Sequence, residues 1–391
     1  MSTFGRCTPS FLLGNTPSDR MNRLLDILRS DEEVKVIRQL TGLDAQRFLD
    51  SAQEVLELEG CFSRPAENVL YRKACKLVDD LCGATKRLPA ALFVAAEMPE
   101  FPNVLTHGGQ SDIYLCERHG GLPGFPGRVV LKRLRIEGER YKELCREALA
   151  CRRLHHPSVL EFLGIDDKTF PEPYKCLISP YLQNGTIMEY RKKKGAANIR
   201  LLTRILEIAE GLDYIHGESL VHGDLHPGNI LIDDEEHVKI TDFGLATFLN
   251  ATTTEYGRSK SSAITPGGTA AYMAPELLGC RMEHETAKLR KKSDKSDVFA
   301  FASVCYELYR GHRPLHKYPG PAIRILLEPK LEGGQLVTKN PWLRLPRPTA
   351  EGTSLPMPVL LWALVQKSWG ISSARPTAGE LIQDLGEAVN S

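Results

Sequence analysis

The sequence has no long apolar run, no excess of charge of either sign and no paired cysteines. No segment approaches the ~18 apolar residues that span a bilayer, and the first twenty residues lack the basic patch and apolar run of a secretion signal. Fifty basic residues stand against forty-nine acidic ones, so the formal charge of +1 provides no global field for nucleic acid or an anionic membrane. The sequence therefore predicts a protein of the cytoplasm or nucleus, with neither a membrane nor nucleic acid as a partner.

The ten cysteines are scattered, with no CxxC pair and no nearby histidine arranged as a zinc site, so we interpret them as reduced packing thiols. Apolar residues make up 42% of the chain and charged residues 25%, which is ordinary for a folded globular protein. At about 150 residues per domain, a chain of 391 residues predicts two or three compact units.

The first hundred residues carry helical periodicity and no chemical motif. Apolar residues recur at three- and four-residue spacing between residues 19 and 83, and Ser30 with Glu33 forms a capping-box pattern. Gly42 suits a helix end. We expect three or four helices in residues 1–100, which form an autonomous bundle, pack on the rest of the chain, recruit a partner or form a dimer.

Near residue 100 the character of the sequence changes. Short β-rich runs at residues 113–116 and 129–131 flank a Gly/Pro-rich stretch, which predicts a hairpin. Helical patterns then return and the remaining strand-like pieces are short, which is typical of an α+β protein. We expect a small β-rich lobe at about residues 101–181 and a larger helical lobe at about residues 182–391.

The strongest chemical signal is HGDLHPGNIL, residues 222–231, followed thirteen residues after Asn229 by Asp242 in a DFG triplet. Phosphoryl transfer needs a carboxylate that orients the attacking hydroxyl and ligands that hold magnesium on the phosphates. Asp224 suits the first role, and the oxygens of Asn229 and Asp242 suit hard Mg²⁺. A lone Asp in a loop is most often a turn former, but the order and spacing of these groups favour the chemical interpretation.

These motifs resemble the eukaryotic protein kinase family from about residue 101 to the end of the chain. The resemblance implies a two-lobed α+β fold, ATP and Mg²⁺ as cofactors, a protein substrate, Asp224 as the catalytic base, and Asn229 and Asp242 as metal ligands. In the family a strand lysine contacts the phosphates and pairs with a helix glutamate. VVLK places that lysine at Lys132, and Glu147 lies fifteen residues later.

Glu143 is the competing partner for the lysine, because it lies one helical turn before Glu147. The apolar register around Leu149 and Leu154 favours Glu147.

The nucleotide-binding loop departs from the family pattern. Where the family has GxGxxGxV, this chain reads THGGQSDI, so Thr106 and Ser111 replace two glycines and predict a stiffer loop. The segment CLISPYLQNGTI resembles the hinge that bonds adenine, with Ser179 as a small gatekeeper. The resemblance implies nucleotide contacts from Gly108, Gly109, Ser111, Ile113, Val130, Lys132, Ser179, Tyr181 and Leu182.

Three further motifs follow in the order that kinases have. GTAAYMAPELL resembles the end of an activation segment, with Glu276 in the APE triplet, and SDVFAFASV places Asp297 at a helix start. ARPTAGEL contributes Arg375, which pairs with the APE glutamate in such folds. Gly223 replaces the arginine of the usual HRD triplet, which predicts that phosphorylation of the activation segment is not the main switch.

The substrate class follows less directly. His226 stands where serine/threonine kinases usually carry lysine, whereas the GTxxYMAPE pattern favours serine/threonine specificity. HGDLHPGN also resembles small-molecule phosphotransferases of the aminoglycoside and choline kinase type, and the altered nucleotide loop motivates a pseudokinase as an alternative. The GGxSDIY loop, HGDLxxxN and the helical front segment resemble the expanded kinase groups of mushroom-forming fungi, which are related to tyrosine-kinase-like enzymes.

Overall fold

The computed structural model describes residues 16–58, 69–94, 102–107, 111–117, 127–134, 141–172, 174–248, 269–278, 292–327, 330–332, 335–337 and 340–390. The chain divides into two compact units. The first comprises Met1–His155 and Glu161–Tyr181, and the second comprises His156–Leu160 and Leu182–Ser391.

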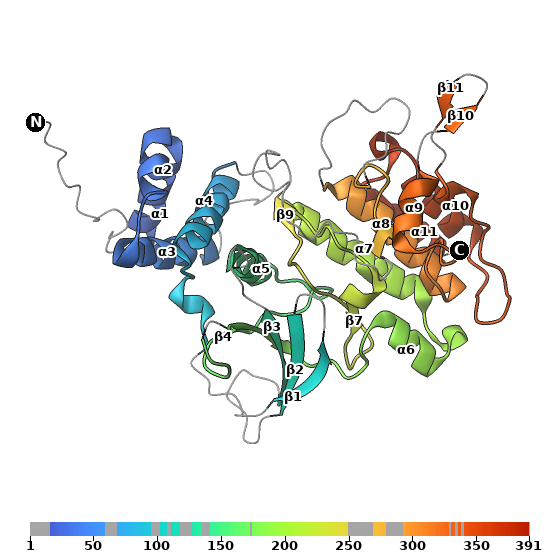
Figure 1. The fold of residues 1–391 in the computed structure, drawn as a ribbon, viewed down its shortest axis with the longest axis horizontal. Helices are drawn as coiled ribbons and strands as arrows, with labels where there is room; N and C mark the ends of the chain where they lie inside the picture. Colours follow the sequence, from blue (N-terminus) through green and yellow to red (C-terminus); the bar gives the residue numbers. More distant parts are fainter. Residues whose placement is uncertain are drawn as a thin grey trace, which may run out of the picture. The chain divides into compact units, whose positions relative to one another are not determined.

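A five-stranded antiparallel sheet forms one part of the first unit, with strand order β1-β2-β3-β5-β4 (Figure 1). Along β2, the side chains of Asp112, Tyr114 and Cys116 are buried while their neighbours are partly exposed, which is the alternation of a strand with one face on a core. The antiparallel pairing of β2 with β3 confirms the predicted hairpin. The strands are β1 (Asn103–His107), β2 (Ser111–Glu117), β3 (Arg128–Leu134), β4 (Gly164–Asp166) and β5 (Cys176–Pro180).

Helices form the rest of the first unit. The Ser30 side chain accepts a hydrogen bond from the Glu33 N–H and caps α2, but the Ser30 N–H donates to the Ile27 carbonyl and the Glu33 side chain binds Arg23, so only half of the predicted capping box forms. The prediction that Gly42 ends a helix is wrong: α2 ends at Ile37, and Gly42, with a φ of +58°, is the first residue of α3. The helices are α1 (Pro17–Arg29), α2 (Asp31–Ile37), α3 (Gly42–Glu57), α4 (Val69–Thr85), the short η1 (Ala90–Leu92) and α5 (Tyr141–Arg153).

One hydrophobic core joins the four front helices to α5 and to the sheet. Leu24, Leu49 and Leu81 from the front helices belong to the same buried cluster as Leu144 of α5 and Ile165 of β4. In Figure 1, α4 runs beside α5, and the two helices are in contact. The front helices therefore pack on the α5 and sheet part of the chain, which is one of the arrangements that their amphipathic pattern allows.

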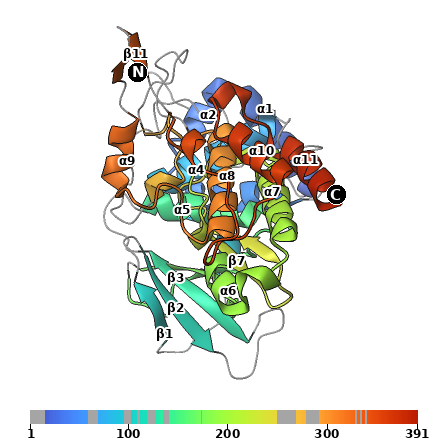
Figure 2. The ribbon, with the colours of Figure 1, turned by 90° about the vertical axis from the view of Figure 1, so that its right-hand side faces the viewer.

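The second unit is mainly helical. α7 packs against α8 and α11, and α10 packs against α8 (Figure 2). Nearly every residue of α8 from Ser296 to Tyr309 is buried, so this helix is the central element of the unit. Its helices are α6 (Ile187–Lys194), α7 (Leu201–Gly217), α8 (Asp294–Arg310), α9 (Gly320–Leu326), α10 (Val359–Ser368) and α11 (Ala378–Asn390), with the short η3 (Ala196–Asn198), η4 (Pro227–Asn229), η6 (Thr269–Ala271), η7 (Trp342–Arg344) and η8 (Ser372–Ala374).

Three short antiparallel strand pairs complete this unit: β6 (Leu220–Val221) with β9 (Thr247–Phe248), β7 (Ile230–Ile232) with β8 (Val238–Ile240), and β10 (Lys330–Glu332) with β11 (Gln335–Val337). Together the units confirm the α+β class. Among the described residues, no helix has the length and apolar character needed to cross a membrane.

Candidate active site

An ion pair joins the lysine of β3 to α5 in the first unit. The Lys132 Nζ lies 2.6 Å from the Glu147 Oε1, and the Glu147 side chain is only 5% exposed. Lys132 lies opposite Ile113 on β2 and Leu177 on β5, so three adjacent strands fix its backbone. The pair forms with Glu147 rather than with Glu143, and the buried carboxylate fixes the direction of the lysine side chain.

The expected nucleotide loop is the connection between β1 and β2. His107 pairs with Asp112 across this hairpin, Thr106 lies in β1 and Ser111 is the first residue of β2. Gly108 and Gly109 lie outside the described residues. Thr106 and Ser111 are therefore placed near the ends of the two strands that flank the loop.

A buried charge pair braces this hairpin against β3. Asp112 accepts a hydrogen bond of 2.8 Å from the Arg133 guanidinium. That guanidinium also lies about 5 Å from the ring centroids of Tyr114, Phe170 and Tyr174. Aromatic rings and a carboxylate thus hold Arg133, and through it they hold the start of β2.

The residues expected to contact adenine lie on neighbouring strands or directly after β5. Val130 of β3 is directly opposite Ser179 of β5, and Ile113 lies on β2 next to β3. The Tyr181 N–H donates to the Arg128 carbonyl at 3.2 Å, and the Arg128 guanidinium lies 4.9 Å from the Tyr181 ring centroid. Leu182 belongs to the second unit, where its carbonyl accepts a hydrogen bond from the Gly185 N–H.

In the second unit, a buried histidine organises the HGDL loop. His222 is fully buried, its Nε2 donates to the Thr241 carbonyl at 3.0 Å, and its Nδ1 accepts the Asp224 N–H at 3.2 Å. These two partners require a neutral ring with its proton on Nε2, because Nδ1 is an acceptor. The ring therefore ties the backbone of Asp224 to the residue just before Asp242.

Asp297, at the start of α8, holds the same loop from the other side. Its carboxylate accepts the backbone N–H groups of His222 and Gly223, each at 2.8 Å, and contacts the His216 Nε2 at 2.9 Å. Asp297 is only 1% exposed. A buried carboxylate that accepts several hydrogen bonds is well satisfied and fixes the loop firmly.

The β7–β8 hairpin sets the spacing of Asn229 and Asp242. Asn229 precedes β7 directly, and the Thr241 N–H donates to the Asn229 carbonyl at 3.0 Å, one residue before Asp242. The Asn229 amide nitrogen donates to the Asp224 carbonyl at 3.0 Å. Three groups that lie up to eighteen positions apart in the sequence are thereby held together at one end of a single hairpin.

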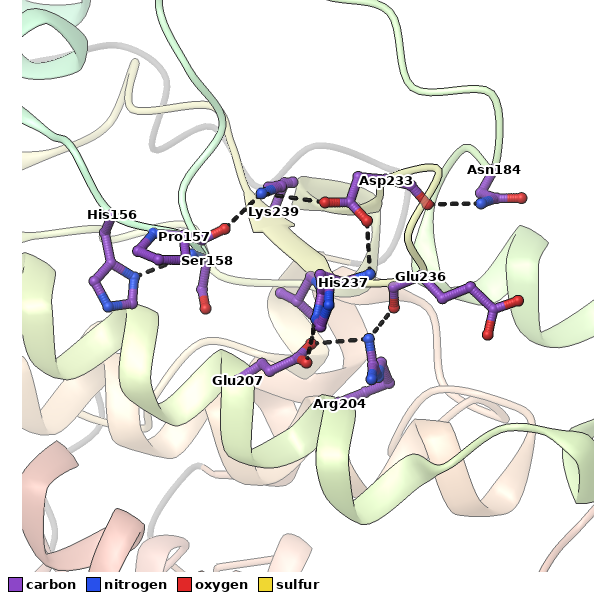
Figure 3. Close-up of polar contacts among 11 residues, drawn as sticks. His156, Pro157, Ser158, Asn184, Arg204, Glu207, Asp233, Glu236, His237 and Lys239 are labelled. Carbon is purple, nitrogen blue, oxygen red and sulfur yellow. Dashed lines mark hydrogen bonds and ion pairs between the residues drawn. The ribbon is translucent and has the colours of Figure 1, made fainter.

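Polar contacts anchor the opposite end of this hairpin (Figure 3). The Asp233 carboxylate accepts the His237 N–H at 2.7 Å and lies 3.2 Å from the Lys239 Nζ. The same ammonium donates to the Pro157 carbonyl at 2.6 Å, and Asn184 donates to the Asp233 carbonyl at 2.7 Å. The turn of the hairpin is thus tied to two other segments of the unit.

Helix α7 contributes the remaining anchors in Figure 3. The Glu207 carboxylate accepts the Val238 N–H at 3.0 Å and contacts the His237 Nδ1 at 2.8 Å. Arg204, one helical turn earlier, bonds to both the Glu207 carboxylate and the Glu236 carbonyl. With both ends fixed, the hairpin is a rigid support for the groups at its Asn229 end.

The APE glutamate and Arg375 form the pair that the motif order predicts. The Glu276 carboxylate lies 2.5 and 3.0 Å from the two terminal nitrogens of Arg375, a bidentate arrangement. Arg375 also donates to the carbonyls of Lys295 and Gly370.

A protein kinase domain model matches residues 103–342, more than half of the chain. The chain belongs to the protein kinase family. It is 28% identical over 264 residues to serine/threonine-protein kinase STY17 of Arabidopsis thaliana, which covers 66% of this chain and 40% of that protein. It is 34% identical over 183 residues to receptor-interacting serine/threonine-protein kinase 1 of Homo sapiens, which covers 45% of this chain and 26% of that protein.

A third relative matches over more of its length. Serine/threonine-protein kinase 12 of Arabidopsis thaliana is 26% identical over 357 residues, 86% of this chain and 70% of that protein. The chain spans less than half the length of the first two relatives. The helices before residue 103 lie outside the match to the kinase domain model.

The side-chain oxygens of Asn229 and Asp242, at one end of the hairpin, suit the magnesium ion that kinases use. The Asn229 nitrogen is the donor to Asp224, so the side-chain oxygen is the atom of this amide that suits a metal. Asp242 brings a carboxylate, whose Oδ1 accepts the Gly244 N–H at 3.3 Å, on a backbone with the unusual φ of +67°. Among the described residues, no group of three or more His, Cys, Asp or Glu side chains is placed to hold a metal ion.

Lys292 fills the place beside Gly223, and the sequence motifs do not reveal this. Gly223 has a φ of +74°, and a Cβ there would lie 2.5 Å from the Lys292 Cδ, 3.0 Å from its Nζ and 3.0 Å from the Leu245 carbonyl oxygen. The Lys292 Nζ donates to that carbonyl at 3.1 Å. A cation from the segment before α8 therefore occupies the space that a side chain at position 223 would enter.

His226 lies close to the carboxylate of Asp224. Its Nδ1 accepts the Gly228 N–H at 3.0 Å, so in the neutral ring the proton is on Nε2, which lies 3.9 Å from the Asp224 Oδ2. Burial lowers the pKa of His226 and outweighs the nearby Asp224 carboxylate, which raises it. A neutral N–H donor thus stands where serine/threonine kinases usually carry a lysine.

Proposed function

We propose that this chain is an ATP- and magnesium-dependent protein kinase that transfers the γ-phosphate to a serine or threonine hydroxyl of a protein. The observation that carries the proposal is that Asn229 is hydrogen-bonded both to Asp224 and to Thr241, the residue before Asp242, while the buried His222 bonds to the backbone of Asp224 and of Thr241. A pseudokinase has no need of a base and two metal ligands in a common rigid support.

Each group has a defined role in this proposal. The Asp224 carboxylate accepts the proton of the acceptor hydroxyl as its oxygen bonds to phosphorus and the bond to the leaving diphosphate oxygen breaks. Asn229 and Asp242 hold Mg²⁺, which neutralises charge on the phosphates. Lys132, fixed by Glu147, binds phosphate oxygens, and the strand residues Ile113, Val130 and Ser179, with Tyr181 and Leu182 after β5, bind the adenine.

Specificity for serine or threonine rests on two supports. The GTAAYMAPE segment has the serine/threonine pattern, and the relatives described above are named serine/threonine kinases.

We also propose that the chain belongs to the tyrosine-kinase-like group of the mushroom-forming fungal type, on the GGxSDIY loop and the helical front segment. The free cysteines among the described residues suit a reducing compartment, and we propose the cytoplasm or nucleus.

A pseudokinase that binds nucleotide without transfer is the second candidate. Thr106 and Ser111 stand at glycine positions of the nucleotide loop, on the ends of β1 and β2, and they favour this alternative.

One assay separates the candidates. The full chain is incubated with Mg-ATP labelled at the γ-phosphate and a generic protein acceptor, and the labelled residues are identified. Phosphoserine or phosphothreonine that disappears in Asp224→Asn supports the proposal, and phosphotyrosine overturns only the specificity. Binding of Mg-ATP without transfer supports the pseudokinase, whereas transfer to an amino alcohol or sugar but not to protein supports a small-molecule phosphotransferase.

A further inference from the structure

Helix α5 has one apolar face, and the front helices cover it. Leu144, Cys145, Ala148 and Leu149 are at most 1% exposed and belong to the core that contains residues of α1, α3 and α4. Their spacing puts them on a single side of the helix. Glu147 points from another side of α5 to Lys132. The packing that supports the glutamate is therefore supplied largely by residues that precede the kinase domain match.

Two adjacent arginines at the end of α5 bind carboxylates of two front helices. Arg152 binds Glu57 of α3 through a fork, with Nε to Oε1 at 2.7 Å and Nη2 to Oε2 at 2.9 Å. Arg153 binds Asp79 of α4 at 3.0 Å, and this pair is almost buried, with side chains 6% and 10% exposed. Burial raises the pKa of Glu57, but the hydrogen bonds from Arg152 and Gln53 outweigh it and lower the pKa, so the Glu57 carboxylate is ionised.

The two kinds of contact act differently on the helix. Apolar packing is not directional, so by itself it allows α5 to rotate or slide by a fraction of a turn. Forked ion pairs are directional and fix both the rotation and the axial position of the residues that carry them. Arg152 and Arg153 are five and six residues from Glu147, so a fixed end of α5 fixes the direction of the glutamate.

We propose that the front helices α1 to α4, within residues 17–57 and 69–85, are a built-in positioning element of the kinase, in which Glu57 and Asp79 hold α5 so that Glu147 meets Lys132. The functional part of this proposal, an effect on the use of ATP, rests on the kinase activity proposed above. The structural part, that Glu57 and Asp79 hold α5, does not depend on that activity. It assigns a positioning role, exerted through Glu57 and Asp79, to helices that have no chemical motif.

The exposed pair is the one to perturb, because the Arg153–Asp79 pair is almost buried and loss of the Asp79 carboxylate beside a buried guanidinium would risk unfolding. In the full chain, Glu57→Arg and Arg152→Glu each place like charges together, and the double exchange restores an ion pair. Arg38→Glu is the matched control. It reverses one charge in the Arg38–Asp80 pair of 3.0 Å, an exposed contact between front-helix segments that does not involve α5.

We expect each single reversal at the Glu57–Arg152 pair to raise the KM for ATP at least about threefold, since exposed pairs contribute up to about 1 kcal/mol, or roughly fivefold. Amide hydrogen exchange in residues 141–153 should quicken in parallel. The double exchange should restore both values to within about twofold of the wild type. Arg38→Glu should change neither the KM for ATP nor the hydrogen exchange of residues 141–153. It should lower the melting temperature about as much as each single reversal at the Glu57–Arg152 pair does.

The KM for ATP separates positioning from simple destabilisation, because a smaller folded fraction lowers kcat and leaves KM unchanged. The proposal is overturned if Glu57→Arg matches the wild type in both measurements, if the double exchange restores neither, or if Arg38→Glu gives the same changes. A wild type without phosphoryl transfer refutes the proposed function instead. In that event, ATP affinity and hydrogen exchange in residues 141–153 still decide whether the front helices hold α5.

Discussion

Replacing Gly223 by alanine tests the packing around the catalytic loop. The backbone at Gly223 has a φ of +74°, a region in which a side chain costs about 1–2 kcal/mol. The new Cβ would also lie 2.5 Å from the Lys292 Cδ and 3.0 Å from the Leu245 carbonyl oxygen. The lysine can move, but it then loses its hydrogen bond to that carbonyl. The carbonyl is backbone and moves less easily.

Gly352→Ala provides the matched control. Gly352 is in the same unit, has a φ of +58°, and has nothing within 4 Å of an added Cβ, so its substitution measures the backbone cost alone. We expect Gly223→Ala to lower the free energy of unfolding by about 2 kcal/mol more than Gly352→Ala, from overpacking and the lost charged hydrogen bond. That difference corresponds to a melting temperature lower by roughly 4–8 °C.

Urea unfolding of both variants and of the wild type measures the difference. In a Lys292→Ala background, the cost of Gly223→Ala should shrink by about 1 kcal/mol, because the displaced side chain is already gone. Equal stability of Gly223→Ala and Gly352→Ala would refute the reasoning. The same geometry makes Gly223→Arg a poor way to restore the family arginine, because the larger side chain must also displace Lys292.

Three further predictions concern activity, and each follows from the proposed function. Asp224→Asn should lower kcat by ~10²-fold or more with nearly unchanged ATP affinity, measured by steady-state kinetics, because the carboxylate contacts the acceptor; an equally active variant contradicts the role. Asp242→Ala should weaken Mg-ATP binding more than Asn229→Ala does, since a carboxylate brings net charge; an unchanged thermal shift of Asp242→Ala with Mg-ATP contradicts this. Phosphatase-treated protein should keep at least about half its activity, because Gly223 replaces the arginine that binds a phosphorylated activation segment; this change is well below the ~1.4 kcal/mol of a tenfold rate difference. Loss of nearly all activity would contradict this prediction and would make Lys292 the first cation to test as a substitute for that arginine.

The sequence predicted those features of the fold and site that belong to a local pattern or to a recognisable motif. The hairpin of β2 and β3, the Ser30 cap, the Lys132–Glu147 contact and the Glu276–Arg375 contact all follow from patterns read over short windows or from motif order. The activation-segment hydroxyls between Thr252 and Thr265 lie outside the described residues, so their role stays a prediction.

Other features depend on contacts between distant segments and left no local signal. Lys292 lies sixty-nine residues after Gly223, with nothing around it that marks a contact with the catalytic loop. The amphipathic pattern of the front helices shows that a face is buried but not what covers it. The Arg152–Glu57 contact joins residues ninety-five positions apart. The prediction that Gly42 ends a helix was wrong because a glycine with positive φ can begin a helix as well as end one.

The two halves of the candidate site are stabilised in different ways, and this has a functional consequence. Asp224 is held by His222 and Asp297, two buried groups within its own unit and within the family match. Glu147 is held by a helix whose packing partners lie largely before that match. Under the proposed function, changes in the front helices should therefore alter how Lys132 binds nucleotide phosphates, while Asp224, Asn229 and Asp242 keep their geometry. Such changes would appear in the KM for ATP and leave the KM for the acceptor protein unaltered, which is the pattern expected of a positioning element.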